Sequence, residues 1–74
     1  MMLERITADP KVCHGQACVK GTRVPVYVVL EALAAGMSVD KVVEDYPPLT
    51  SEDVRACVYY ASLVTREEEI TLGA

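Results

Sequence analysis

The sequence predicts a mainly α-helical domain, in which an N-terminal β-hairpin precedes three helices with the outline of a helix-turn-helix. Short extended segments and loop residues occupy the N-terminal region. Beyond them, apolar residues recur at helical spacing in three segments, and a proline, a glycine or a capping residue stands at their boundaries. The 74 residues fit one domain, residues 1–74, because no stretch is long or polar enough to link two domains.

The hairpin is expected over about residues 3–20. Leu3–Thr7 has an apolar residue near either end of a short extended stretch, and Asp9–Pro10 ends it in a turn. Further along, Val12–Cys13 and Ala17–Val19 flank the loop His14–Gln16. The glycine in that loop supplies the backbone conformation that a short hairpin connection needs.

The segment after the hairpin carries a motif of Gly21, Thr22, Arg23 and Pro25. Gly21 permits a sharp exit from the second strand, and Thr22 is suited to hydrogen-bond nearby backbone groups. The planar guanidinium of Arg23 suits carbonyls or a carboxylate, and we expect it to tie the hairpin to the helical body rather than to reach into another molecule. Pro25 has the fixed φ of a first helical turn. The motif is therefore interpreted as structural.

The first helix is expected over residues 25–35 and the second over residues 39–45. Gly36 follows the first helix where a left-handed C-terminal residue belongs. Ser38 is a good N-cap for the second helix, and Pro47 prevents that helix from continuing. The apolar face of the first helix consists of Val26, Val29, Leu30, Leu33 and Ala34.

The third helix is expected over residues 51–67. Thr50 precedes it as a capping residue, and Asp53 stands three positions further on, which is the spacing of a capping box. Acidic residues also suit the positive end of the helix dipole. The buried stripe of this helix is expected to contain Val54, Cys57, Val58, Ala61 and Val64.

The tight proline-containing turn between the second and third helices is typical of a helix-turn-helix. In that geometry the outward face of the third helix meets the major groove, and its candidate DNA contacts are Ser51, Arg55 and Tyr59. Glu52 and Asp53 would repel phosphates there. An arrangement that serves structure or protein binding is therefore favoured over one that binds DNA strongly.

The charge distribution is asymmetric along the chain. The net charge is −4, but residues 1–25 contain four basic and two acidic residues, whereas residues 26–74 contain three basic and nine acidic residues. The hairpin end is mildly basic and the helical body is acidic. The charged end formed by Arg66, Glu67, Glu68 and Glu69 is a candidate contact for a partner, although a frayed end in solvent fits it equally well.

The cysteines indicate neither a metal site nor a nucleophile. Cys13, His14 and Cys18 are zinc-type ligands, but a structural zinc site takes about four ligands, and Cys57 belongs to the expected buried stripe. Adjacent residues on a strand point to opposite faces, which argues against a pair of Cys13 and His14 as nucleophile and base. We expect no metal, no cofactor and no enzymatic activity.

The sequence also indicates a cytoplasmic protein. No apolar run approaches the roughly 20 residues that span a bilayer, and no signal-type hydrophobic stretch follows the N-terminus. The three cysteines are an odd number in a chain without an export signal, so reduced thiols are expected.

Two long segments, Ile6–Val26 and Gly36–Thr50, resemble the family catalogued as domain of unknown function 433. The resemblance covers about residues 4–66, although Ala17 stands where a proline is common in the family. It implies a homeodomain-like helix-turn-helix domain. Because such proteins are often encoded beside PIN-like nucleases, it also implies the antitoxin half of a toxin–antitoxin pair. The most specific elements of the resemblance are Gly21-Thr22-Arg23 ahead of Pro25-Val26, and the link from Tyr46-Pro47 to Leu49-Thr50.

Two functional hypotheses follow. The first is an antitoxin-like binding protein that forms a homodimer, neutralises a PIN-type ribonuclease and binds its own operator, weakly when alone. The alternative is a stand-alone helix-turn-helix DNA-binding regulator. Acidic helices favour the first, because carboxylates complement the basic surface that would otherwise hold RNA phosphates. The homodimer is expected because a small core without Phe or Trp is short of buried area.

Overall fold

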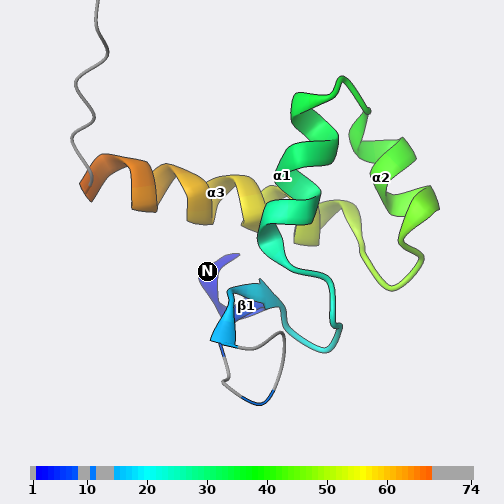
Figure 1. Cartoon of the computed structure of the whole chain (residues 1–74). Helices are drawn as coiled ribbons and strands as arrows, with labels where there is room; N and C mark the ends of the chain where they lie inside the picture. Colours follow the sequence, from blue (N-terminus) through cyan, green and yellow to red (C-terminus); the bar gives the residue numbers. More distant parts are fainter. Residues whose placement is uncertain (1, 9–10, 12–14, 68–74) are drawn as a thin grey trace, which may run out of the picture.

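The computed structural model describes residues 2–8, 11 and 15–67, and it shows a mainly helical chain with an N-terminal two-stranded hairpin (Figure 1). The fold class predicted from the sequence is therefore confirmed. In chain order the elements are the 3₁₀ turn η1 (Met2–Arg5), the strands β1 (Ile6–Thr7) and β2 (Cys18–Val19), and the helices α1 (Val26–Ala34), α2 (Val39–Asp45) and α3 (Ser51–Glu67).

The hairpin differs from the predicted one at its N-terminal end. β1 and β2 pair in antiparallel register, with Ile6 opposite Val19 and Thr7 opposite Cys18. Leu3–Arg5, expected to be extended, instead belong to η1, which packs against α3. Contact with a helix distant in sequence overrides the weak local preference for a strand. The predicted strand residues 12–13 and loop residue His14 lie outside the described residues.

The turn from β2 into α1 is built as the motif predicts, except at its arginine. Gly21 has a φ of 83°, a conformation that glycine adopts without strain. The Thr22 hydroxyl donates a 2.8 Å hydrogen bond to the Val19 carbonyl and accepts one of 3.1 Å from the Val24 N–H. Arg23, however, is exposed and takes part in no ion pair among the described residues, so the tie to the helical body that was predicted for it is not seen there.

The helix boundaries follow from local capping. α1 begins at Val26 rather than at the expected residue 25, because Pro25 has extended backbone angles and serves as the N-cap. The C-terminus of α1 is a Schellman motif, in which Gly36 has a φ of 98° and the Met37 N–H bonds the Ala32 carbonyl at 3.1 Å. The side chain of Ser38 caps α2 by accepting from the Lys41 N–H at 3.1 Å.

The core lies where β2, α1, α2 and the N-terminal half of α3 meet. It contains mostly valines, and the aromatic side chains are only partly buried or exposed. The C-terminal half of α3 extends past the other helices (Figure 1). Two residues of the stripe predicted on α3 are exposed: Val64, in this protruding half, is 38% exposed, and Val58, in the N-terminal half beside the buried Cys57, is 47% exposed. The buried cluster consists of Val19, Val26, Val29, Val42, Leu49, Val54 and Cys57.

Candidate interaction faces of α3

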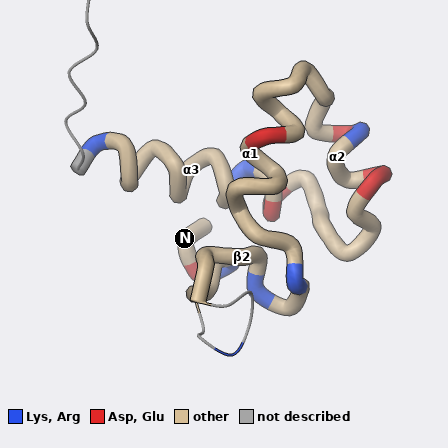
Figure 2. Tube along the Cα trace, viewed as in Figure 1, with Lys and Arg blue, Asp and Glu red and all other residues tan. Residues whose placement is uncertain are grey.

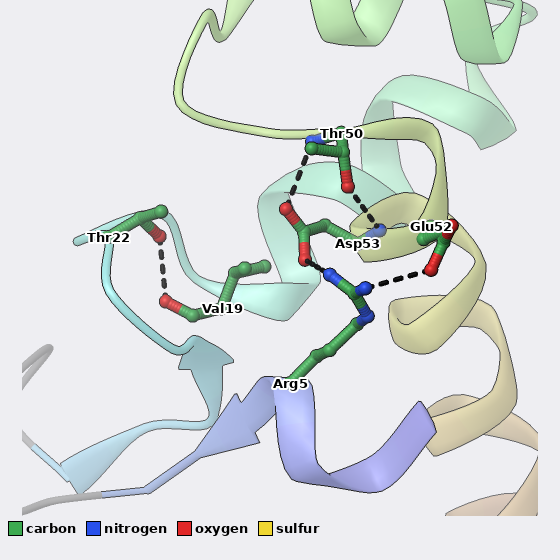
Figure 3. Close-up of polar contacts among 6 residues, drawn as sticks. All are labelled: Arg5, Val19, Thr22, Thr50, Glu52 and Asp53. Atoms are coloured by element: carbon green, nitrogen blue, oxygen red, sulfur yellow. Dashed lines mark hydrogen bonds and ion pairs between the residues drawn. The ribbon is translucent and has the colours of Figure 1, made fainter. Parts of the chain in front are cut away.

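The start of α3 is fixed by a reciprocal capping box (Figure 3). The Thr50 N–H donates to Asp53 Oδ2 at 2.9 Å, and the Asp53 N–H donates to Thr50 Oγ1 at 3.2 Å. Both bonds satisfy backbone donors that have no partner within the helix. The capping box predicted from the spacing of these two residues is confirmed, and it sets the direction in which α3 leaves the turn.

Arg5 ties the N-terminal segment to this helix end, the task that the sequence analysis gave to Arg23. Its Nη1 lies 3.0 Å from Asp53 Oδ1, and its Nη2 lies 2.8 Å from Glu52 Oε2 (Figure 3). The two carboxylates expected to repel DNA phosphates thus share one guanidinium. No local pattern could have indicated this contact, because it spans more than 45 residues of sequence.

Asp53 is the buried member of this network, with a side chain only 11% exposed. Burial alone would raise the pKa of its carboxyl. The hydrogen bonds from the Thr50 N–H and from Arg5, together with the positive charge of Arg5, outweigh burial and hold the pKa of Asp53 below its ordinary value. Asp53 is therefore an ionised structural residue and is not available to a ligand.

The three candidate DNA contacts lie four residues apart and so share one face of α3. Ser51 and Arg55 are exposed, and Tyr59 is partly buried. Val58, which the sequence analysis placed in the core, belongs to the same side. Together with Val39 of α2 and neighbouring residues of α3 it lines a shallow hollow of about 360 Å³. The lining consists of Val39, Val54, Arg55, Val58, Tyr59 and Ser62.

Charged residues are sparse along α3 between its first turns and its C-terminal end (Figure 2). Arg55 is the only charged lining residue of the hollow among those described, and α3 has no further charged residue until Arg66. The nearest basic residue on α2, Lys41, lies 3.7 Å from Glu44 and 3.4 Å from Asp45. The hollow therefore offers one cation, a phenol and valine side chains.

A second, larger groove of about 420 Å³ lies on a different side of α3, where the first turns of α1 and the loop before β2 face the C-terminal half of α3. Its described lining contains no charged residue. Tyr27 is 50% exposed and Val64 is 38% exposed there. The lining consists of Gln16, Ala17, Val26, Tyr27, Leu30, Tyr60, Ala61, Val64 and Thr65.

The candidate partner contacts at the end of α3 are only partly described. Arg66 is exposed, and Glu67 is the last residue of the helix. Glu68 and Glu69 lie outside the described residues. The helix therefore carries its basic residue Arg66 at the end where the dipole is negative, which is a favourable position for a cation.

The described cysteines are packing residues. Cys18 and Cys57 are fully buried, and burial together with the charge of Asp53 raises the pKa of the Cys57 thiol to about 11. Cys57 is thus a protonated thiol at neutral pH. Cys13 and His14, the other members of the metal cluster weighed above, lie outside the described residues.

Within the described part of the chain, no helix is both long and apolar enough to cross a bilayer.

The fold and the capped third helix define a small hairpin-plus-three-helix domain with a helix-turn-helix outline. Residues 6–61 match the model of one family, described as a protein of unknown function, DUF433. The chain belongs to this family.

Two relatives support the assignment. The chain is 43% identical over 58 residues to an uncharacterised protein, y4eO, of Sinorhizobium fredii; the match covers 78% of this chain and 26% of that protein. It also resembles the crystal structure of a DUF433 member from Anabaena variabilis, with a TM-score of 0.77 and 32% identity. That alignment covers 85% of this chain and 62% of the crystallised one. The chain thus spans about a quarter of the first relative and less than two thirds of the second.

Proposed function

We propose that this chain is an antitoxin-like binding protein, which acts by binding rather than by catalysis and whose ligand is a PIN-type ribonuclease. The partner class comes from the family resemblance. The observation that carries the proposal is the chemistry of the hollow beside α2, where Arg55 stands next to the exposed Val58 and the partly buried Tyr59. Arginine and tyrosine with apolar neighbours are the residues that concentrate binding energy at protein interfaces.

The same face is a poor match for a phosphate backbone. Duplex affinity at physiological salt comes from neutralising several phosphates, whereas this face offers Arg55 alone among the residues that the structure describes. The nearby Glu52 side chain remains 64% exposed despite its pairing with Arg5. The isolated chain is therefore proposed to bind duplex DNA weakly.

The acidic end of the chain supplies the second part of the proposed contact. Glu67, Glu68 and Glu69 follow Arg66, and carboxylates there would compete with RNA phosphates for the basic cleft of a nuclease. In this proposal the hollow binds the nuclease, and the carboxylates block its RNA-binding cleft.

A stand-alone DNA-binding regulator is the second candidate, and one observation favours it. Ser51, Arg55 and Tyr59 share the outward side of the second helix of a helix-turn-helix, the side that reads bases in that class. An arginine in this position suits guanine, whose O6 and N7 accept both of its donors.

A calorimetric titration at about 0.15 M salt separates the two, with the nuclease encoded beside the gene and the upstream duplex as ligands. We expect the nuclease to bind, and we expect Val58→Glu to weaken that binding at least tenfold. Ala34→Glu is the matched control, since it adds the same charge at an exposed residue of α1 that lines neither this hollow nor the groove. The regulator hypothesis would replace this proposal if the chain bound the duplex sequence-specifically at nanomolar levels and did not bind the nuclease. Duplex binding should then be lost in Arg55→Ala.

A further inference from the structure

The groove between α1 and the C-terminal half of α3 is an apolar surface that the proposed function does not use. Its wall includes two tyrosines, Tyr27 and Tyr60, and the exposed Val64. A surface of this kind on a small domain marks a contact with another molecule.

Val64 is exposed because α1 and α2 do not extend along that part of α3. The helix face that carries it is apolar. Val64 lies seven residues, or about two helical turns, after the buried Cys57, and so shares its face. The stripe that packs on the core therefore continues along α3 beyond α1 and α2 (Figure 1). The second half of that stripe lacks a covering element among the described residues.

We propose that a second copy of this chain covers the groove, in a two-fold contact in which the protruding half of each α3 enters the groove of the other copy. In a two-fold contact every residue near the axis meets its own counterpart, so a charge there would face a like charge. The described lining has no charged residue. A surface shaped for an oppositely charged foreign protein would carry charges, whereas this one avoids them.

The small core of one chain is a reason to expect that a contact between two copies stabilises the fold. Among the described residues the largest fully buried side chains are one leucine, four valines and two cysteines, and no aromatic side chain is fully buried. A standard interface removes about 800 Å² from each partner, which is roughly 15% of the 5378 Å² that one chain exposes. Burying Tyr27, Tyr60 and Val64 in this way would add the large apolar contacts that the core lacks.

The inference is independent of the proposed function, because Val58 and Val64 lie about 120° apart around α3, at about 100° per residue. Sedimentation velocity of the full chain between about 1 and 100 µM is the test. We expect a species of twice the 8.1 kDa chain mass, which becomes monomeric in Val64→Glu and in Tyr27→Lys. Val58→Glu is the matched control and should stay dimeric.

Circular dichroism of each variant establishes that it is folded, and both substituted side chains are already exposed, so folding is expected to survive. The thermal midpoint of the wild-type chain should rise with protein concentration, while that of Val64→Glu should not. A wild-type chain that is monomeric at 100 µM overturns the inference. A dimer that survives Val64→Glu and Tyr27→Lys but is lost in Val58→Glu also overturns it, because the contact then lies at the other hollow.

Discussion

Replacing Asp53 by alanine should destabilise the fold far more than replacing its neighbour Glu52, although both carboxylates bind the same Arg5. The Asp53 side chain is 11% exposed and also accepts the 2.9 Å bond from the Thr50 N–H, whereas the Glu52 side chain is 64% exposed and bonds Arg5 alone among the described residues. Loss of a helix cap with a charged acceptor costs roughly 2 kcal/mol. An exposed ion pair contributes about 0.5 kcal/mol or less.

Urea unfolding followed by circular dichroism measures both free energies at one protein concentration. For a domain of this size a change of 1 kcal/mol shifts the thermal midpoint by about 4–8 °C, so Asp53→Ala should lower it by roughly 8–16 °C. Glu52→Ala should change it by about 4 °C or less. Equal effects of the two substitutions would show that the shared arginine, and not the buried cap, holds the helix end.

The same residue gives a pH dependence with a definite sign. Because the pKa of folded Asp53 lies below its ordinary 3.8, the ionised carboxylate stabilises the fold at pH above that ordinary value. This stability is lost as the pH falls through the lower, folded pKa. The difference in unfolding free energy between the wild type and Asp53→Asn should therefore be constant near neutral pH and shrink below about pH 4. A difference that grows on acidification would contradict the assigned shift.

Three further predictions concern local structure. Thr22→Val should lower the free energy of unfolding by about 1 kcal/mol, because it removes the hydroxyl bonded to Val19 and Val24. Thr22→Ser keeps the hydroxyl and should retain most of the stability. Urea unfolding measures both variants. Gly36→Ala should cost about 1 kcal/mol through its φ of 98° alone, since a Cβ there would meet no atom within 4 Å; a much larger loss would reveal a clash. In a Cys13→Ser background the two buried thiols, Cys18 and Cys57, should react with a thiol reagent at pH 8 only as fast as the chain unfolds, and rapid labelling in the folded state would contradict their burial.

Local chemistry allowed the helical part of the fold to be predicted from sequence. The predicted bounds of the second and third helices coincide with those of α2 and α3 because Ser38 and Thr50 are strong N-caps with their partners three residues away. Gly36 ends α1 as predicted, since its backbone conformation is open to glycine without strain. These features depend only on residues within one helical turn.

The features that could not be predicted depend on distant contacts. Leu3–Arg5 turn into η1 because α3 lies beside them, and Arg5 rather than Arg23 reaches the helix start. Periodicity placed Val58 and Val64 in one buried stripe, but the two lie about 120° apart around α3, and burial depends on what packs against each side. Val64 is at the surface because the apolar stripe that it shares with Cys57 is longer than its covering, whereas Val58 lies on another side, beside α2, and stays half exposed.

The two faces of α3 also explain how Arg55, the one cation among the described residues that line each hollow, would contribute to DNA binding in an assembly. A dimer formed through the Val64 side leaves Arg55 and Val58 free on both copies, since those residues lie on a different side of α3. Two weak sites held together bind a ligand with matching repeats more tightly than either alone, by an amount set by their separation. Operator binding, if the dimer supplies it, should therefore fall in Val64→Glu even though that residue touches no DNA in the proposed geometry. Electrophoretic mobility shift of the upstream duplex with wild type, Val64→Glu and Arg55→Ala measures this coupling. Equal binding by the wild type and Val64→Glu would show that each chain binds the duplex on its own.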